Sequence, residues 1–135
     1  MGTCQLGVPT NQGCLQERVL RDGTSTSFFS DQFRNPIYVG DIVRIVSYLA
    51  RDPAAAAGHR VLNMGGSERV SRVDIAQAVA AHLSLDGGCI VSAPASSVPL
   101  AVASPADISM DSSKLFSIVP FAPLVLREAL RFVFV

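Results

Sequence analysis

The order of its apolar segments constrains the fold of this chain more than any other feature. Through the middle of the chain, β-prone runs alternate with segments whose apolar residues recur at helical spacing. We expect strands at residues 24–29, 36–39 and 60–63, with 89–91 as a fourth candidate, and helices at residues 14–22, 41–52, 71–83, 113–115 and 123–132. This alternation favours a layered α/β fold with parallel strand pairing.

Local signals fix where several of these elements begin. Asp41 stands directly before Ile42 and Val43, and a helix N-cap explains it better than a role in a site. Ser71 and Asp74 have the spacing of a capping box. Pro123 fits the first position of the last helix. The turn Met64-Gly65-Gly66 calls for a positive φ angle, which glycine adopts at little cost.

The composition indicates an ordered domain with apolar surface to spare. Hydrophobic residues make up 49% of the 135 residues, and charged residues 16% against an average of about 25%. The excess predicts a protein partner, or a missing half of the same fold, that covers apolar surface. Basic and acidic residues are balanced at 11 each without a basic run, which argues against nucleic acid and anionic membranes. Residues 1–13 predict an irregular leader before a domain over residues 14–135.

Cysteine and histidine point away from disulfides and metals. The three cysteines (Cys4, Cys14 and Cys89) form no Cys-x-x-Cys pair, so we expect reduced thiols in the cytoplasm. His59 and His82 have no Cys or carboxylate nearby at metal-ligand spacing, so no metal site is expected. The N-terminus lacks the pattern of a signal peptide.

Four stretches in order resemble the C-terminal part of extended short-chain dehydrogenases/reductases, the NAD-dependent epimerase/dehydratase superfamily. They are the run from Phe28 to Val43 (FFSDQFRNPIYVGDIV), Val61–Gly66 with the helix after Ser71, Pro105–Leu115 (PADISMDSSKL), and Leu126–Leu130 (LREAL). Within that superfamily the chain is most similar to the dTDP-4-dehydrorhamnose reductase group, including its RmlD-like substrate-binding domain. It is also similar to the non-catalytic β subunit of methionine adenosyltransferase. The resemblance implies part of a Rossmann-like fold: an incomplete parallel sheet with packed helices and a small substrate-side subdomain.

The motifs that such enzymes use for catalysis are missing from the sequence. Dinucleotide binding needs Gly-x-x-Gly-x-x-Gly after a strand, and no three glycines here have that spacing. Catalysis needs a Tyr-x-x-x-Lys pair, but Ile42 follows Tyr38 at that interval and Asp52 follows Tyr48. We therefore expect no catalytic residue and no cofactor site in this chain, with NADPH or NADH bound only by a full-length relative. The N-terminal dinucleotide-binding half is expected to be absent.

Three residues are candidates for substrate binding, the first of them by the resemblance. Arg34 lies in the loop whose arginine contacts the sugar nucleotide or its phosphates in the family; a solvated side chain or a pair with Asp31 is the alternative. Asn63 and Gly65 could border a ligand cleft, although a turn that also includes Gly66 explains them as well. Ser104 stands where sugar-nucleotide members commonly have arginine, so one phosphate contact is missing.

Three interpretations of function follow. The first is a truncated substrate-binding domain of the dTDP-4-dehydrorhamnose reductase type, not catalytic alone, whose parent enzyme would use NADPH to reduce a 4-keto deoxysugar nucleotide. The alternative is a non-catalytic regulatory or interaction subunit that resembles the methionine adenosyltransferase β subunit. A third is a defective product without a stable role. Fold alone cannot separate them, because function is determined by sites.

Overall fold

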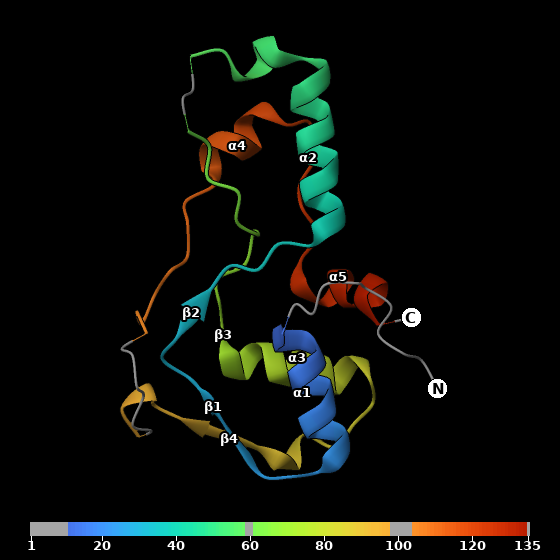
Figure 1. Cartoon of the computed structure of the whole chain (residues 1–135), viewed down its shortest axis with the longest axis vertical. Helices are drawn as coiled ribbons and strands as arrows, with labels where there is room; N and C mark the ends of the chain where they lie inside the picture. Colours follow the sequence, from blue (N-terminus) through green and yellow to red (C-terminus); the bar gives the residue numbers. More distant parts are fainter. Residues whose placement is uncertain (1–10, 59–60, 98–103, 135) are drawn as a thin grey trace.

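The computed structural model describes residues 11–58, 61–97 and 104–134 and has mixed α/β structure. In chain order its helices and strands are α1 (Asn11–Asp22), β1 (Thr26–Phe29), β2 (Phe33–Arg34), α2 (Val39–Arg51), β3 (Val70–Ser71), α3 (Arg72–His82), β4 (Ile90–Ala93), α4 (Ser113–Ile118) and α5 (Leu126–Val133) (Figure 1). Short 3₁₀ helices occur at Pro53–Ala56, Gly87–Cys89 and Ala95–Ser97. The α/β class predicted from the alternation of segments is confirmed.

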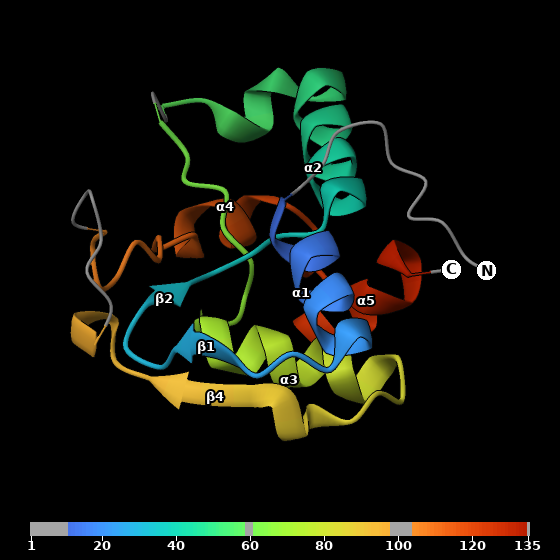
Figure 2. The same cartoon turned by 60° about the horizontal axis from the view of Figure 1, so that its bottom comes forward.

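A parallel pair of strands forms the base of the fold. β1 and β4 pair from Thr26 opposite Ile90 to Phe29 opposite Ala93. Helix α3 contacts both strands, and α1 and α5 pack against α3 (Figure 2). Parallel strands cannot be joined by a tight turn, so the chain between them is long enough to hold α2 and α3. The predicted parallel pairing is thus confirmed.

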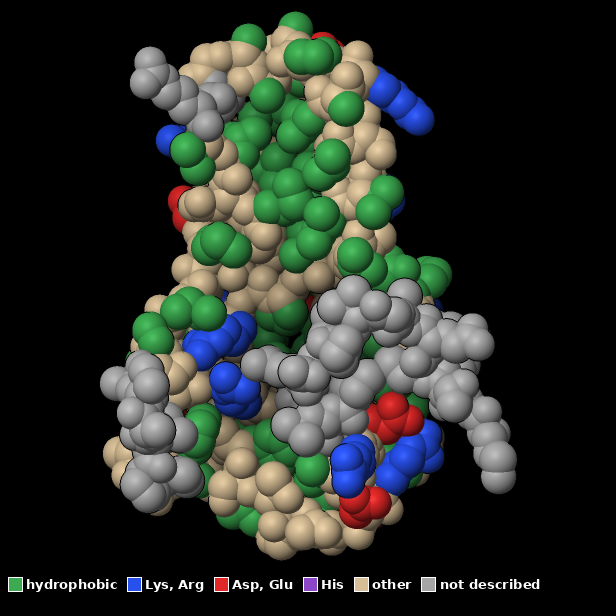
Figure 3. Space-filling model, viewed as in Figure 1, with side chains coloured by type: hydrophobic (Ala, Val, Ile, Leu, Met, Phe, Trp, Pro, Cys, Tyr) green, Lys and Arg blue, Asp and Glu red, His purple; other side chains and the backbone are tan. Residues whose placement is uncertain are grey.

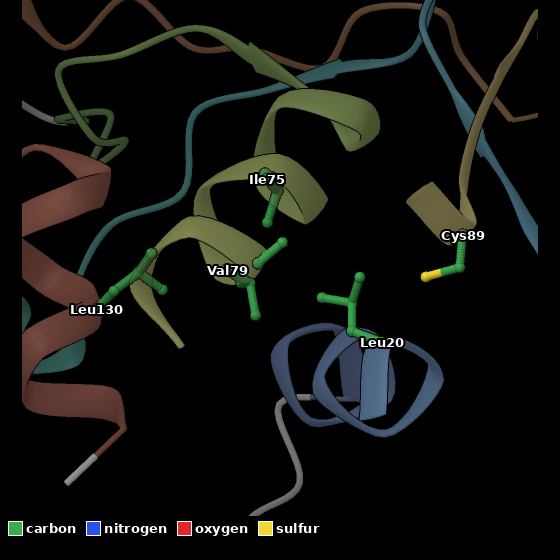
Figure 4. Packing of buried hydrophobic residues seen from close by; sticks show 6 residues of the cluster. Leu20, Ile75, Val79, Cys89 and Leu130 are labelled. Atoms are coloured by element: carbon green, nitrogen blue, oxygen red, sulfur yellow. The ribbon is translucent and has the colours of Figure 1, made fainter. Parts of the chain in front are cut away.

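The first hydrophobic core lies between α3 and its neighbouring elements. Its buried residues are Leu20, Ile75, Val79, Ala80, Cys89 and Leu130, which come from α1, α3, the turn before β4, and α5 (Figure 4). Ile75 and Val79 are four residues apart and therefore lie on one face of α3. Cys89 is a buried thiol that belongs to this core. The structure does not test the expected reduced thiols, and Cys4 lies outside the described residues.

A second hydrophobic core lies between α2 and α4. Ile45 and Leu115 are fully buried there, and Val119 is 5% exposed. Partly buried aromatic side chains close it, with Tyr48 set edge-on against Phe121 at 6.3 Å between ring centroids. Figure 3 shows hydrophobic side chains gathered in a strip between these two helices on the viewed face. The apolar residues whose helical spacing predicted α3 and α2 thus contribute to the first and second cores, respectively.

Helix α2 begins before the residue that was expected to cap it. The N-cap is Tyr38, and Asp41 lies inside the first turn, so the predicted N-cap at Asp41 is wrong. Its fully buried carboxylate accepts hydrogen bonds from Leu124 N (2.8 Å) and from Arg44 Nη1 (2.9 Å). Asp41 therefore ties α2 to the segment before α5, and its negative charge still suits the helix N-terminus.

Two predicted strands are absent, and one helix starts later than expected. Residues 36–39 form no strand, because the pairing partner β3 meets the chain earlier, at β2. Residues 61–63 are also not a strand in the structure, since no described segment pairs with them, and Val61 is 78% exposed. Pro123 is not the first residue of α5, which has Val125 as its N-cap. The capping box of Ser71 and Asp74 is confirmed.

Candidate functional site

The antiparallel ribbon of β2 and β3 carries the candidate site. Arg34 pairs with Val70, and continuing this register sets Gln32 opposite Arg72. Side chains alternate between the two faces of a ribbon. Gln32 and Arg34 therefore lie on one face and Phe33 on the other, and Arg72, the first residue of α3, joins the first face through its hydrogen bond to Gln32. We call these three residues the arginine face, and Figure 3 shows basic side chains next to one another at the level of β2.

Arg34 is half-buried and fixed by two hydrogen bonds. Its Nη1 donates to the Phe33 carbonyl at 2.6 Å, and its Nη2 donates to Ser104 Oγ at 3.2 Å. The alternative pair with Asp31 is not formed, because that carboxylate accepts from Ala95 N at 2.9 Å. Within the described ranges, no carboxylate lies within ion-pair distance of Arg34. Its charge thus has no counterion there.

Gln32, just before β2, holds Arg72, the first residue of α3. Arg72 Nε donates to Gln32 Oε1 at 3.0 Å, and Gln32 is only 1% exposed. Gln32 Nε2 is buried and has no hydrogen-bond partner among the described atoms. Burial, and then repulsion from the Arg34 guanidinium, lower the pKa of Arg72. The two arginines are therefore close enough to repel each other.

The other face of the ribbon is electrostatically satisfied. The Arg69 guanidinium lies 3.5 Å from the centroid of the Phe33 ring, and its Nε donates to Asp107 Oδ2 at 2.8 Å. The Ser109 hydroxyl and backbone N–H, and then Arg69, lower the pKa of Asp107 to about 2. A stacked, ion-paired arginine has little need of an external anion, so this face is structural.

Three chain segments meet next to the ribbon, around the side chain of Asn35. Asn35 Nδ2 donates to the carbonyls of Gly66 (3.3 Å) and Met110 (3.0 Å), and Met110 N donates back to Asn35 Oδ1 (3.1 Å). Gly66 N also donates to the Asn35 carbonyl at 3.0 Å. We call this meeting point the crossing; it joins the segments at residues 35–36, 63–66 and 110–112.

Asn63 and Gly65 belong to the crossing. Asn63 Nδ2 donates to the Asp111 carbonyl at 3.1 Å, and Gly65 N donates to Ser112 Oγ at 2.8 Å. Positive φ at Gly65 and Gly66 was the wrong expectation, since neither has it. Glycine is needed for another reason: a Cβ on Gly65 would overlap the Asn35 carboxamide. The structure thus gives both predicted residues structural contacts.

Asn35 follows Arg34 in the chain and contacts Gly65 and Gly66, while Asn63 joins the crossing through the Asp111 carbonyl. That the three predicted residues contact a substrate remains a prediction. Sequence reasoning missed Gln32 and Arg72. The signal for Gln32 was its Gln-x-Arg spacing with Arg34, which puts two side chains on one face only in extended chain, whereas this run was expected to be a loop.

Metal and membrane sites are not apparent in the part of the chain that the structure describes. No three His, Cys, Asp or Glu side chains gather there as metal ligands. His82 packs near Phe134, with 6.1 Å between ring centroids, and His59 lies outside the described residues. None of the described helices is long and apolar enough to cross a bilayer.

The match to known proteins covers nearly the whole chain. A family model for the RmlD substrate binding domain matches residues 11–134. The chain belongs to this family. This RmlD-type domain has no significant match among curated protein sequences.

Solved structures share the fold of the RmlD-type domain at low sequence identity. A dTDP-4-dehydrorhamnose reductase from Clostridium acetobutylicum is 13% identical with a TM-score of 0.79, and the match covers 95% of this chain and 44% of that one. The reductase from Bacillus anthracis, solved with NADP, is 14% identical with a TM-score of 0.75, covering 90% of this chain and 41% of that one. The reductase from Yersinia enterocolitica is 20% identical with a TM-score of 0.70, covering 88% and 40%. The RmlD-type domain thus spans about two fifths of each reductase.

The residues of the RmlD-type domain do not fit a dinucleotide cofactor. Pyrophosphate binding in Rossmann folds uses a strand that leads through a glycine-rich turn into a helix. In the described part of the chain, β2 leads into α2 through residues 35–38, which contain no glycine, and β3 runs directly into α3.

Proposed function

We propose that this chain is the sugar-nucleotide-binding part of a reductase of the dTDP-4-dehydrorhamnose type and does not catalyse alone. The observation that carries the proposal is Arg34, half-buried without a carboxylate partner in the described residues, within a chain of the RmlD substrate binding domain family. A guanidinium in this state suits the phosphates of a nucleotide sugar. Asn63 and Gly65, which belong to the crossing, would form the neighbouring side of the substrate-binding site.

The parent reaction would be NADPH-dependent reduction of a 4-keto deoxysugar nucleotide. The cofactor and the catalytic Tyr-x-x-x-Lys pair would come from a dinucleotide-binding half outside these 135 residues. That half, or another protein, would cover the apolar strip between α2 and α4 (Figure 3). The domain would work in the cytoplasm, without nucleic acid or membrane as a partner.

Two titrations test this function. Titrating the chain with dTDP-glucose by calorimetry should give binding that Arg34→Met weakens and Arg51→Met, an exposed arginine on α2, does not. Titrating it with NADPH by fluorescence should give no binding. Absence of dTDP-glucose binding by a folded chain, or clear NADPH binding, would contradict the proposal. No observation favours the regulatory-subunit alternative.

A further inference from the structure

The arginine face holds two positive charges that the described part of the chain does not neutralise. Arg72, the first residue of α3, is hydrogen-bonded to Gln32, which precedes Arg34 by two residues on the same face of the ribbon, so the two arginines lie near each other. Repulsion between them contributes to the lowered pKa of Arg72. Two like charges side by side in a partly buried place are unfavourable unless an anion lies between them.

The other arginines that the structure describes do not share this state. Four lie within 4.0 Å of a carboxylate: Arg18, Arg21, Arg44 and Arg69. Three more are exposed on helices, where water solvates the charge: Arg51, Arg127 and Arg131. Arg34 and Arg72 are half-buried and, within the ranges that the structure covers, have no carboxylate partner. Among the described arginines, burial without a carboxylate partner is therefore found only at the arginine face.

Gln32 fixes how Arg72 is presented. Its Oε1 accepts the hydrogen bond from Arg72 Nε, and both terminal nitrogens of that guanidinium have no partner in the described residues. Gln32 Nε2 lies buried beneath the same face with no acceptor. A buried donor without a partner in the protein is a place where an acceptor atom of a water, ion or ligand is expected. Two independent features thus point to an anionic ligand.

We propose that Arg34 and Arg72 together bind one diphosphate group, and that Gln32 positions Arg72 for it. Planar guanidinium groups match phosphate oxygens with paired donors, and two of them match two linked phosphates better than one carboxylate. Arg72 would thereby supply the phosphate contact that Ser104 does not, since Ser104 Oγ instead accepts from Arg34. The nucleotide sugar as the source of the diphosphate rests on the proposed function.

The test is a ³¹P NMR titration of inorganic pyrophosphate with the full 135-residue chain, repeated with orthophosphate and dTDP-glucose. Arg72→Met should weaken pyrophosphate binding at least about tenfold, because it removes hydrogen bonds to a charged group. Arg51→Met removes the same charge from exposed α2 and should change the affinity less than about twofold, since distant surface charges are screened. Circular dichroism of each variant reports its folding.

Gln32→Glu keeps the test decisive if Arg72→Met does not fold. Its carboxylate would sit against the Arg72 guanidinium, so the variant should fold and still lose pyrophosphate affinity by about tenfold or more. Orthophosphate should bind the wild-type chain more weakly than pyrophosphate, because it cannot contact both arginines with separate phosphates.

The outcomes separate this inference from the proposed function. Pyrophosphate affinity that is unchanged in folded Arg72→Met or Gln32→Glu overturns the inference, as does a wild-type chain that binds no pyrophosphate. If dTDP-glucose binds and Arg72→Met leaves it unaffected, the proposed function stands and Arg72 has no part in it. If pyrophosphate binds through Arg72 but dTDP-glucose binds no tighter, the anion site stands and the nucleotide-sugar function fails.

Discussion

Replacing Gly66 with alanine tests how rigid the crossing is. A Cβ at Gly66 would overlap the carbonyl oxygen of Pro36, which is backbone and cannot rotate away. The φ angle of Gly66 is not positive, so alanine can adopt the backbone conformation. The whole cost must therefore come from this contact, which can be relieved only if the segments at residues 35–36 and 63–66 separate.

The size of the effect follows from the bonds that such a separation breaks. Gly66 makes two hydrogen bonds with Asn35, at 3.0 Å and 3.3 Å. Losing both costs about 2 kcal/mol at about 1 kcal/mol each. The overpacking that remains adds about 1–3 kcal/mol. The total of about 3–5 kcal/mol corresponds to a melting temperature lower by roughly 10–18 °C in a domain of this size.

Thermal melts followed by circular dichroism measure the effect, with Gly87→Ala as the matched control. A Cβ at Gly87 would meet only Ile90 Cδ1, at an ordinary 3.8 Å. That variant should therefore be as stable as the wild type or slightly more so, because alanine restricts the unfolded chain. If Gly66→Ala melted within about 2 °C of the wild type, the close approach at the crossing would not be rigid and this reasoning would fail.

Three further perturbations probe other parts of the structure. Asp41→Ala should lower the free energy of unfolding by about 3 kcal/mol or more in urea denaturation, because it leaves the buried Leu124 N–H without an acceptor. Asp41→Asn keeps an acceptor and should cost less, so equal losses would contradict this. Leu115→Ala should cost about 2–5 kcal/mol in the same assay, since the side chain is fully buried in the second core, and a loss under 1 kcal/mol would mean that this core is loose. The carboxyl of Asp107 should titrate near pH 2 by NMR, and a midpoint near 4 would refute the Ser109 and Arg69 contacts. Because its folded pKa lies below the unfolded value of 3.8, its contribution to stability is complete above about pH 4 and is lost as the pH falls toward 2. Asp107→Asn should lack this pH-dependent stability.

Helices were predictable where a local signal sufficed. The capping box of Ser71 and Asp74 and the apolar spacing after it located α3, and Gly23, which has a positive φ, follows the end of α1 at Asp22. Each of these features depends on residues within one or two turns of the chain. The sequence contains all the information that they require.

Strand positions failed where pairing depends on a distant segment. Residues 36–39 are as β-prone as residues 33–34, but only the latter meet β3. Residues 61–63 have strand composition and no partner in the described residues. Propensity describes fit to a half-buried sheet surface, so it cannot choose a strand when the partner decides.

The candidate site was predictable only in part for the same reason. Arg34 could be selected because a guanidinium in the resembling loop suits phosphate, whereas Arg72 is separated from it by much of the chain and reaches it only through the ribbon register. Asp41 was assigned from the sequence as a helix cap, because its partner Leu124 is also far away in the chain. Side chains that act across the fold have no local pattern.

The two separate hydrophobic cores have a consequence for slow backbone motions. Proteins open in cooperative units that often coincide with packed submotifs, and here α2 and α4 share one core while α3 and α5 share the other. Their amides should therefore exchange with solvent deuterium in two groups with different protection. Arg72 is the first residue of α3, so an anion bound there would slow exchange in α3 more than in α2. Exchange rates measured with and without pyrophosphate would then report which of the two hydrophobic cores the ligand protects from local unfolding.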